Sequence, residues 1–238
     1  MRQVILTRSA QDSAQTARAL DASRFEPVIA PLFDICPQHH SVPDRSFDAV
    51  IATSRHALCA LDPALREKLR QIPLYVVGPA TAQSAQEMGF EHIHCGPGNA
   101  EGLARLIRAQ TGKGCLLFLT GEPRKPDLER ALAPHFDLIV CSLYHSVNRT
   151  GFPPDALQAI TDPEPIWLHF SEKSAERAAK FIKNTGYEAF FTKGLHIAIA
   201  PAITEMLNAT GCQHCLTAAQ PTQKALLETL HALPYPSP

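Results

Sequence analysis

Small polar residues follow several apolar segments of this chain, at the points where those segments end. They are Thr7, Arg8, Thr53, Ser54, Arg55, Thr120, Gly121, Ser171 and Ser174. Residues 76–82 read VVGPATA, with Gly78, Ala80 and Thr81 where a strand would turn into a helix. Backbone N–H groups and hydroxyls at a helix start bind anions, because the positive end of the helix dipole lies there. These positions predict an anionic ligand, although helix capping alone uses the same residue types.

A tyrosine lies in a segment that begins like a buried strand and continues past the expected end. Residues 139–151 read IVCSLYHSVNRTG, so an apolar run passes into a mixed run that carries Tyr144. A phenol can donate a proton or a hydrogen bond to a substrate. A buried ring with a polar tip would be a purely structural role. From the residues alone, both interpretations stay open.

Other thiols and imidazoles are interpreted as structural. Residues 211–215 (GCQHC) contain a CxxC pair, but no second pair completes a zinc site. Cys215 is expected on a strand, whereas a redox CxxC opens a helix. The paired histidines at 39–40 would face opposite ways in an extended segment. His56 and His169 are interpreted as local hydrogen-bonding residues, because no nucleophile-elbow sequence accompanies them. We therefore expect no metal.

Composition excludes several partners. The chain has 238 residues and a formal net charge of −1 at pH 7, so no global basic field attracts nucleic acid or an anionic membrane. Any anion must be bound by local groups. The sequence has no apolar run of about 18 residues and no signal-peptide core. Seven cysteines, an odd number, lie mostly in apolar runs, as in reduced proteins. We expect a cytoplasmic protein with no nucleic-acid and no membrane partner.

Short apolar segments alternate with amphipathic segments along the chain. The expected strands are residues 4–7, 27–30, 49–53, 74–78, 92–95, 115–120, 138–141, 166–170, 197–200 and 215–218. Their continuous apolarity indicates burial on both faces. Helical patterns follow nearly every strand. This alternation predicts an α/β fold with doubly wound parallel sheets.

The sequence also contains a circularly permuted internal repeat. The similar segments are 50–58 and 167–175, 74–90 and 196–212, 115–132 and 3–20, and 136–147 and 25–36. Each copy would have five strands, the size of a small doubly wound domain. The second copy is split: its first part lies in the C-terminal half of the chain, and its last part lies at the N-terminus. Chance similarity between α/β units is the alternative.

The repeat predicts two similar domains, one inserted in the other. The expected boundaries are 1–36 plus 149–238 for the discontinuous domain, 41–142 for the inserted domain, and 37–40 and 143–148 for the crossover linkers. Tyr144 lies in the second linker, and its counterpart in the repeat is Phe33. Only one of the two positions has a hydroxyl. Ligands bind at the carboxyl ends of parallel strands, so we expect the polar strand ends of both domains to line one cleft.

Together these features resemble the uroporphyrinogen-III synthase family. The similar segments are VILTR at 4–8, ATS at 52–54, VVGPATA at 76–82, FLTGEPR at 118–124, SLYHSV at 142–147, HFSEKSA at 169–175 and AAQPTQKALLETL at 218–230. Each motif is short. Their order, which covers nearly the whole chain, carries the resemblance.

The resemblance implies two α/β domains joined by a two-stranded crossover, with the substrate between them. It implies a lyase of haem and sirohaem biosynthesis that closes hydroxymethylbilane, a linear tetrapyrrole, to uroporphyrinogen III. The last pyrrole ring is inverted, water is lost, and no cofactor takes part. Tyr144 matches the family tyrosine to which protonation of the departing hydroxyl is attributed.

The same resemblance implies how the substrate is bound. Its carboxylates would be held by the polar strand ends together with Arg8, Arg55 and Arg124. The family often has Thr or Ser after the proline that begins the helix at 201, whereas this chain has Ala202, so only a backbone contact is expected there. His56 replaces a common Asn. We expect a monomer, for which transient contact with the preceding pathway enzyme stays open.

Two other function classes stay open. A two-domain cytoplasmic protein that binds a small molecule by hinge closure would have the same architecture. Stabilisation by sugars or amino acids, and not by a tetrapyrrole, would favour it. A dinucleotide-dependent enzyme is disfavoured, because the sequence has no GxGxxG motif.

Overall fold

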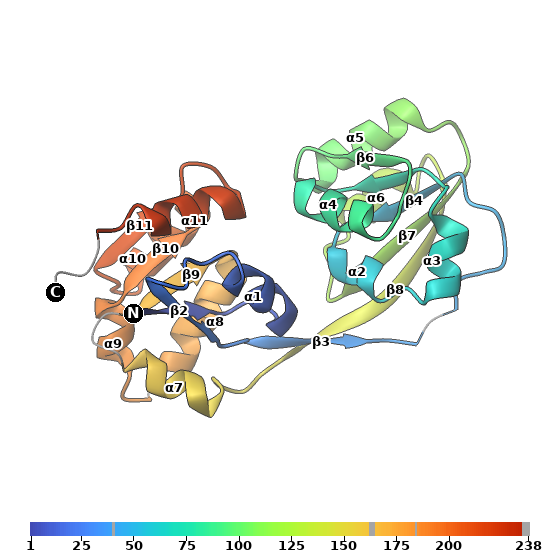
Figure 1. Ribbon diagram of the computed structural model, residues 1–238. Coiled ribbons are helices and arrows are strands. Elements are labelled where there is room, and N and C mark those ends of the chain that lie inside the picture. Colours follow the sequence, from blue (N-terminus) through green and yellow to red (C-terminus); the bar gives the residue numbers. More distant parts are fainter. Residues whose placement is uncertain (40, 162–164, 184, 235–238) are drawn as a thin grey trace. The chain divides into compact units, whose positions relative to one another are not determined.

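The computed structural model describes residues 1–39, 41–161, 165–183 and 185–234 (Figure 1). His40, the last residue of the first expected linker, lies outside the described residues. The chain forms two compact units. The first contains Met1–Asp34 and the chain from Asn148 onward, and the second contains Ile35–Val147. Each unit has a sheet dominated by parallel strands with helices on both faces, so the expected fold class is confirmed.

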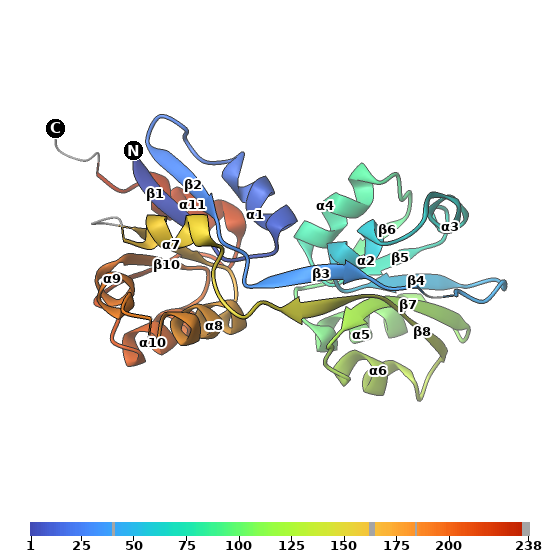
Figure 2. The same cartoon turned by 90° about the horizontal axis from the view of Figure 1, so that it is seen from below.

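The first unit has a sheet of parallel strands. In spatial order they are β11 (His214–Thr217), β10 (Leu195–Ala198), β9 (Ile166–His169), β1 (Arg2–Leu6) and β2 (Phe25–Ile29). Helices α1 (Ala10–Ala17) and α11 (Gln223–His231) cover one face, and α7 (Pro154–Ile160), α8 (Glu172–Ile182), α9 (Glu188–Lys193) and α10 (Pro201–Ala209) cover the other (Figure 2). Val4 and Leu6 pack toward α11, whereas Ile5 packs toward α7 and α8. Burial of both strand faces explains the continuous apolar runs.

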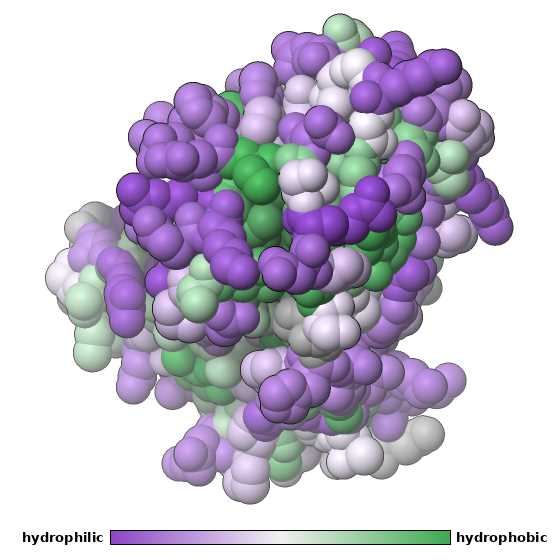
Figure 3. All heavy atoms as spheres, turned by 90° about the vertical axis from the view of Figure 1, so that its right-hand side faces the viewer, coloured by the Kyte–Doolittle hydropathy of each residue, from purple (hydrophilic) through white to green (hydrophobic). Residues whose placement is uncertain are grey.

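The second unit repeats this layered arrangement. Its strands, in spatial order, are β3 (Phe33–Pro37), β8 (Asp137–Asn148), β7 (Cys115–Glu122), β4 (Ala49–Ala52), β5 (Leu74–Val76) and β6 (Ile93–Cys95). Helices α2 (Arg55–Cys59), α3 (Pro63–Leu69) and α4 (Pro79–Glu87) cover one face, and α5 (Ala100–Gln110) and α6 (Asp127–Leu132) cover the other. In Figure 3, hydrophilic side chains cover much of the face turned to the viewer, with apolar side chains between them.

The two sheets share a strand order and a register, as the sequence repeat predicts. One row across the second sheet contains His94, Tyr75, Ile51, Phe118 and Val140. The positions that the repeat pairs with the last four form one row across the first sheet: Ile197, Leu168, Leu6 and Ile29. Leu216 of β11 extends this row as His94 extends the other. A slip of one residue would turn every side chain to the opposite face. The repeat therefore describes two copies of one sheet.

Strand β8 continues past the sheet-forming segment and pairs with β3. The N–H of Gln38 donates to the carbonyl of Leu143 at 2.8 Å, and the N–H of Arg149 donates to the carbonyl of Leu32 at 3.1 Å. Partner numbers fall along one strand as they rise along the other, so the pairing is antiparallel. The guanidinium of Arg149 also binds Asp34 at 2.8 Å. Residues 138–141 were expected as a strand and 143–148 as a crossover linker, and the structure joins both in one strand that ends at Asn148.

Two histidines form a buried pair in the core of the first unit. Nε2 of His169 lies 2.9 Å from Nδ1 of His196, and Nε2 of His196 lies 2.8 Å from the carbonyl of Phe191. A carbonyl only accepts, so Nε2 of His196 is protonated and its Nδ1 accepts from His169. Burial lowers the pKa of His196 to about 4 and the pKa of His169 well below its usual value. His169 is thus a hydrogen-bonding core residue, as expected.

We predict that the first unit loses stability as the pH falls from about 6.5 toward 4. The unfolded chain takes up a proton at each ring in this range, whereas the folded chain does not. The stabilisation is present above the unfolded pKa and is lost below it. In thermal melts followed by circular dichroism, the double variant His169→Leu/His196→Leu should show a flatter dependence of melting temperature on pH. His92→Gln, an exposed position of the second unit, is the control, and a wild-type slope in the double variant would contradict the prediction.

Candidate functional site

Most of the residues expected to bind a ligand lie at the carboxyl edges of the two sheets. In the second unit, Thr53 follows β4, while Thr120 and Gly121 lie near the end of β7. In the first unit, Thr7 follows β1 and Ser171 follows β9 by two residues. Ligands of open parallel sheets bind at this edge. The structure therefore gathers these groups within each unit.

Two helices at this edge begin without a side-chain cap, unlike α2 and α8. Oγ of Ser54 accepts from the N–H of His56 at 3.1 Å, and Oγ of Ser171 accepts from the N–H of Ser174 at 3.2 Å. Helices α4 and α10 instead have Gly78 and Ala200 as N-caps, each followed by proline. No side chain of the described residues caps these two helices.

Helices α4 and α10 therefore begin with backbone N–H groups that no described side chain caps. Ala80 and Ala202 occupy the second position of α4 and α10, and both are exposed. Their N–H groups point out of the helix start, where the dipole favours an anion. Thr81 is buried beside one of them. The caps also correct two expected strand ends: β5 ends at Val76 and β10 at Ala198, because Gly78 and Ala200 already begin helices.

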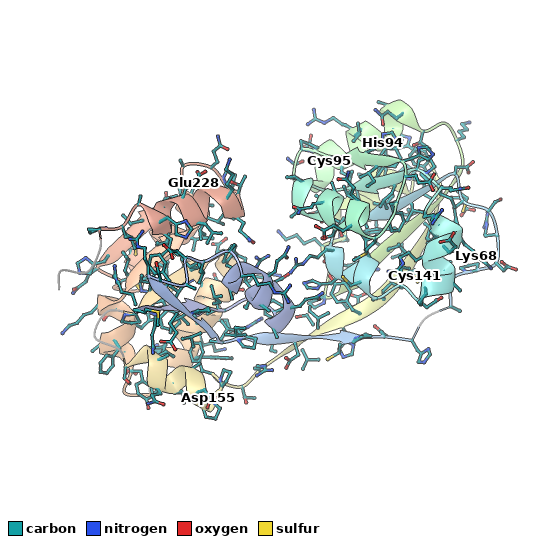
Figure 4. The ribbon with its side chains drawn as sticks, in the orientation of Figure 1. Lys68, His94, Cys95, Cys141, Asp155 and Glu228 are labelled. Carbon is teal, nitrogen blue, oxygen red and sulfur yellow. The ribbon has the colours of Figure 1, made fainter. Side chains whose placement is uncertain are left out.

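Tyr144 lies over Gly121 because the pairing of β7 with β8 is irregular. Thr120 pairs with Ser142, but Gly121 pairs with Tyr144, so Leu143 is an additional residue in β8. A bulge of this kind redirects the following side chain. Leu143 is buried and Tyr144 is half-buried, three residues after Cys141, which Figure 4 labels on the same strand. A Cβ atom on Gly121 would lie 2.2 Å from Cζ of Tyr144, so the hydroxyl-bearing end of the ring covers the glycine.

His56 contacts the same tyrosine. The two ring centroids are 5.8 Å apart, and the rings meet edge to face at 68°. His56 lies in the first turn of α2, which Ala57 and Leu58 fix in the core. Sequence reasoning interpreted His56 as a local hydrogen-bonding residue and missed this contact. No local pattern could have found it, because α2 and β8 are distant in the chain.

Arg8, expected to bind the ligand, is engaged inside the first unit. Its Nη1 donates to Oε1 of Gln223 at 3.0 Å and to Oγ1 of Thr16 at 3.3 Å. Its guanidinium lies 4.3 Å from the ring centroid of Phe170 and 3.7 Å from Asp12. Burial lowers the pKa of Arg8 to about 10, so it remains cationic at neutral pH. Arg8 thus connects α1, α11 and the end of β9.

The other expected groups differ in their surroundings. Arg124 binds Glu129 through Nε at 2.6 Å and also binds Glu122. The hydrogen bond with Glu129 raises the pKa of Arg124, and two carboxylates around it leave excess negative charge. Arg55 is the half-buried first residue of α2. The hydroxyl of Thr7 is buried and has no hydrogen-bond partner among the described residues.

The thiols of the CxxC pair are not activated. Cys212 and Cys215 are both free. Burial raises the pKa of Cys212, and burial together with Cys212 raises the pKa of Cys215 to about 11. Such thiols are neutral near pH 7 and are poor nucleophiles. Among the described residues, no cluster of His, Cys, Asp or Glu could hold a metal, and no helix is long and apolar enough to cross a membrane.

Comparison with known proteins gives one consistent result. Residues 14–228 match the family described as uroporphyrinogen-III synthase HemD. A uroporphyrinogen-III synthase of Schizosaccharomyces pombe is 35% identical over 103 residues, which are 37% of this chain and 40% of that protein. The match therefore spans less than half of that relative.

Two solved structures share the fold. Uroporphyrinogen-III synthetase from Helicobacter pylori superposes with a TM-score of 0.66 at 18% identity, covering 98% of this chain and 100% of that one. A mutant uroporphyrinogen III synthase from Thermus thermophilus gives a TM-score of 0.56 at 15% identity, covering 97% and 98%. At these identities the similarity concerns the fold.

We predict that Gln223→Leu destabilises the first unit by about 1 kcal/mol, because it removes a partner from the half-buried Arg8 guanidinium. Urea denaturation followed by circular dichroism measures the change. The neighbouring Lys224→Ala is the control, because Lys224 forms an exposed pair at 3.8 Å with Glu228, which Figure 4 labels on α11. Its effect should stay within about 0.5 kcal/mol. Equal effects of the two variants would argue against the Arg8 network.

Proposed function

The chain belongs to the uroporphyrinogen-III synthase family, and we propose that it is the lyase that closes hydroxymethylbilane to uroporphyrinogen III. Members of this family are enzymes of tetrapyrrole biosynthesis. The observation that carries the proposal is the family match over residues 14–228. We propose further that the enzyme acts in the cytoplasm as a monomer without a cofactor. Transient contact with the preceding enzyme would shorten the time that its unstable substrate is free.

Tyr144 is the residue that we assign to the first chemical step. Its hydroxyl donates a proton or a hydrogen bond to the terminal hydroxyl of the substrate, which leaves as water and produces an azafulvene cation. The last pyrrole ring attacks this cation through its substituted carbon, and the new carbon–carbon bond gives a spiro intermediate. The older bond from that carbon to the bridging methylene then breaks, and the methylene bonds to the unsubstituted carbon of the same ring, so that the ring is inverted. Proton loss restores the aromatic ring. The half-buried position of Tyr144, with its phenol end placed over Gly121, supports this role.

Selectivity requires that one conformation of a flexible substrate be held. Closure without guidance gives the symmetric isomer, so the protein must place the last ring for attack at its substituted carbon. Oriented donors on rigid elements meet this need. The helix starts of α4 and α10 and the hydroxyls at the carboxyl edges of both sheets are such donors.

We assign the substrate carboxylates to these donors. The N–H groups of Ala80 and Ala202 lie at the uncapped starts of α4 and α10, and charge-assisted bonds to carboxylates are stronger than neutral ones. The further proposed contacts are Gly78, Thr81, Thr7, Thr53, Ser54, Arg55, Thr120, Ser171 and Ser174, whereas Gly121 lies under the ring of Tyr144. Arg8 and Arg124 were expected to bind carboxylates directly. Their internal partners support a different role, in which they fix the segments that carry the donors.

We predict that the purified protein, supplied with hydroxymethylbilane formed in situ, gives mainly the type III isomer. Chromatography of the oxidised porphyrins measures the ratio of isomers. A reaction without the protein gives the spontaneous type I background. Production of type I alone in both samples would refute the proposed activity.

We predict that Tyr144→Phe lowers kcat by roughly 10- to 100-fold, near the lower range of general-acid contributions. The ring and its packing remain, so the melting temperature should change little. Tyr187→Phe, in the first unit and also half-buried, is the control and should keep full activity. Wild-type kcat in Tyr144→Phe would remove this hydroxyl from the chemistry.

A further inference from the structure

We infer that Gly121 is a positioning residue that sets the location of the Tyr144 hydroxyl. The inference rests on the proposed function and adds a residue to it. Three elements surround the ring of Tyr144: the backbone at Gly121, the bulge at Leu143 and the imidazole of His56. We call them the Tyr144 packing site. All three belong to the second unit, so their geometry is internal to one compact body.

The glycine is required for space and not for backbone conformation. The described glycines with positive φ are Gly89, Gly98, Gly186 and Gly211, and Gly121 is not among them. A Cβ atom on Gly121 would instead lie 2.2 Å from Cζ, 2.3 Å from Cε2 and 2.5 Å from Cε1 of Tyr144. Carbon atoms that are not bonded to each other stay at about 3.5 Å or more at optimal separation. Any side chain at this position must therefore displace the ring by roughly 1 Å.

The displaced atoms are those next to the reactive group. Cζ carries the hydroxyl, so the clash falls on the end of the ring that we assign to proton donation. The other end of the tyrosine is fixed by the backbone of β8. A methyl group at position 121 would therefore rotate the phenol away from β7. A misplacement of about 1 Å can cost on the order of 100-fold in rate.

Leu143 and His56 prevent the ring of Tyr144 from simply moving aside to make room for a side chain at position 121. Leu143 is buried in the core cluster of this unit, so the bulge that directs Tyr144 toward Gly121 is anchored. His56 meets the ring edge to face, and Ser54 caps the helix that carries it. Ala57 and Leu58 are fully buried, which holds that helix in place. The ring thus has one packed position, defined from three directions.

The first test uses Gly121→Ala in two backgrounds. In the wild-type background we expect kcat to fall by about 100-fold with little change in KM. In the Tyr144→Phe background, which keeps the ring but lacks the hydroxyl, the same substitution should change kcat less than about threefold. Equal losses in both backgrounds would show that alanine damages the sheet without acting through the hydroxyl, and would overturn the inference.

A matched glycine controls for the substitution itself. A Cβ atom on Gly112 would meet nothing within 4 Å, and Gly112 lies in the same unit outside the packing site. Gly112→Ala should keep the wild-type kcat and melting temperature. If Gly112→Ala lowers kcat as much as Gly121→Ala does, the effect is not specific to the ring contact and the inference fails.

The second test does not depend on activity, so it separates this inference from the proposed function. In NMR spectra of the whole protein, the Hα protons of Gly121 should show nuclear Overhauser contacts to the Tyr144 ring and a ring-current shift. Tyr144→Leu should abolish both signals. His56→Ala should alter the ring resonances, whereas His56→Phe, which keeps an aromatic edge, should preserve them. Absence of the Gly121 contacts in the wild type would overturn the inference even if the isomer assay succeeds.

Discussion

Parallel pairing of strands buried on both faces is the constraint on which the rest of this structure depends. Each buried strand needs neighbours in register and helices above and below it. Parallel strands must be joined by crossovers, so all carboxyl ends of a sheet meet at one edge. In the second unit this pairing brings Thr53 and Thr120 to one edge of the sheet, and Thr7 lies at the corresponding edge of the sheet in the first unit.

Much of this could be predicted from the sequence. Continuous apolar runs indicated buried strands, and the repeat predicted which residues share a row: Ile51 pairs with Tyr75 as Leu168 pairs with Ile197. Strand ends were less predictable, since Gly78 already caps α4 in a segment that an apolar count assigns to β5. The local backbone at a cap depends on hydrogen bonds that composition does not encode.

The site was predictable only where its signal is local. Tyr144 and the uncapped turn at Gly78 carry a local signal, whereas the contact of His56 with Tyr144 and the clash at Gly121 arise from tertiary packing. The bulge at Leu143 inserts one residue and changes which side chain faces Gly121. The periodicity of apolar residues in one strand cannot reveal a bulge, because a bulge is defined by the pairing with the neighbouring strand.

The arginines show that the sequence also does not reveal which charged groups are already paired inside the protein. From the sequence, Arg8 and Arg124 are plausible partners for an anionic substrate, but each already binds groups of its own unit. Apart from Arg55, the groups that we assign to the carboxylates are neutral donors, and those of α4 and α10 lie on rigid helix starts. Such donors attract a polyanion less strongly than free cations, but they point in fixed directions. For a reaction whose difficulty is holding one conformation of a flexible chain, fixed direction matters more than strength of attraction. The same logic applies to Tyr144, whose ring is confined by packing and not by charge.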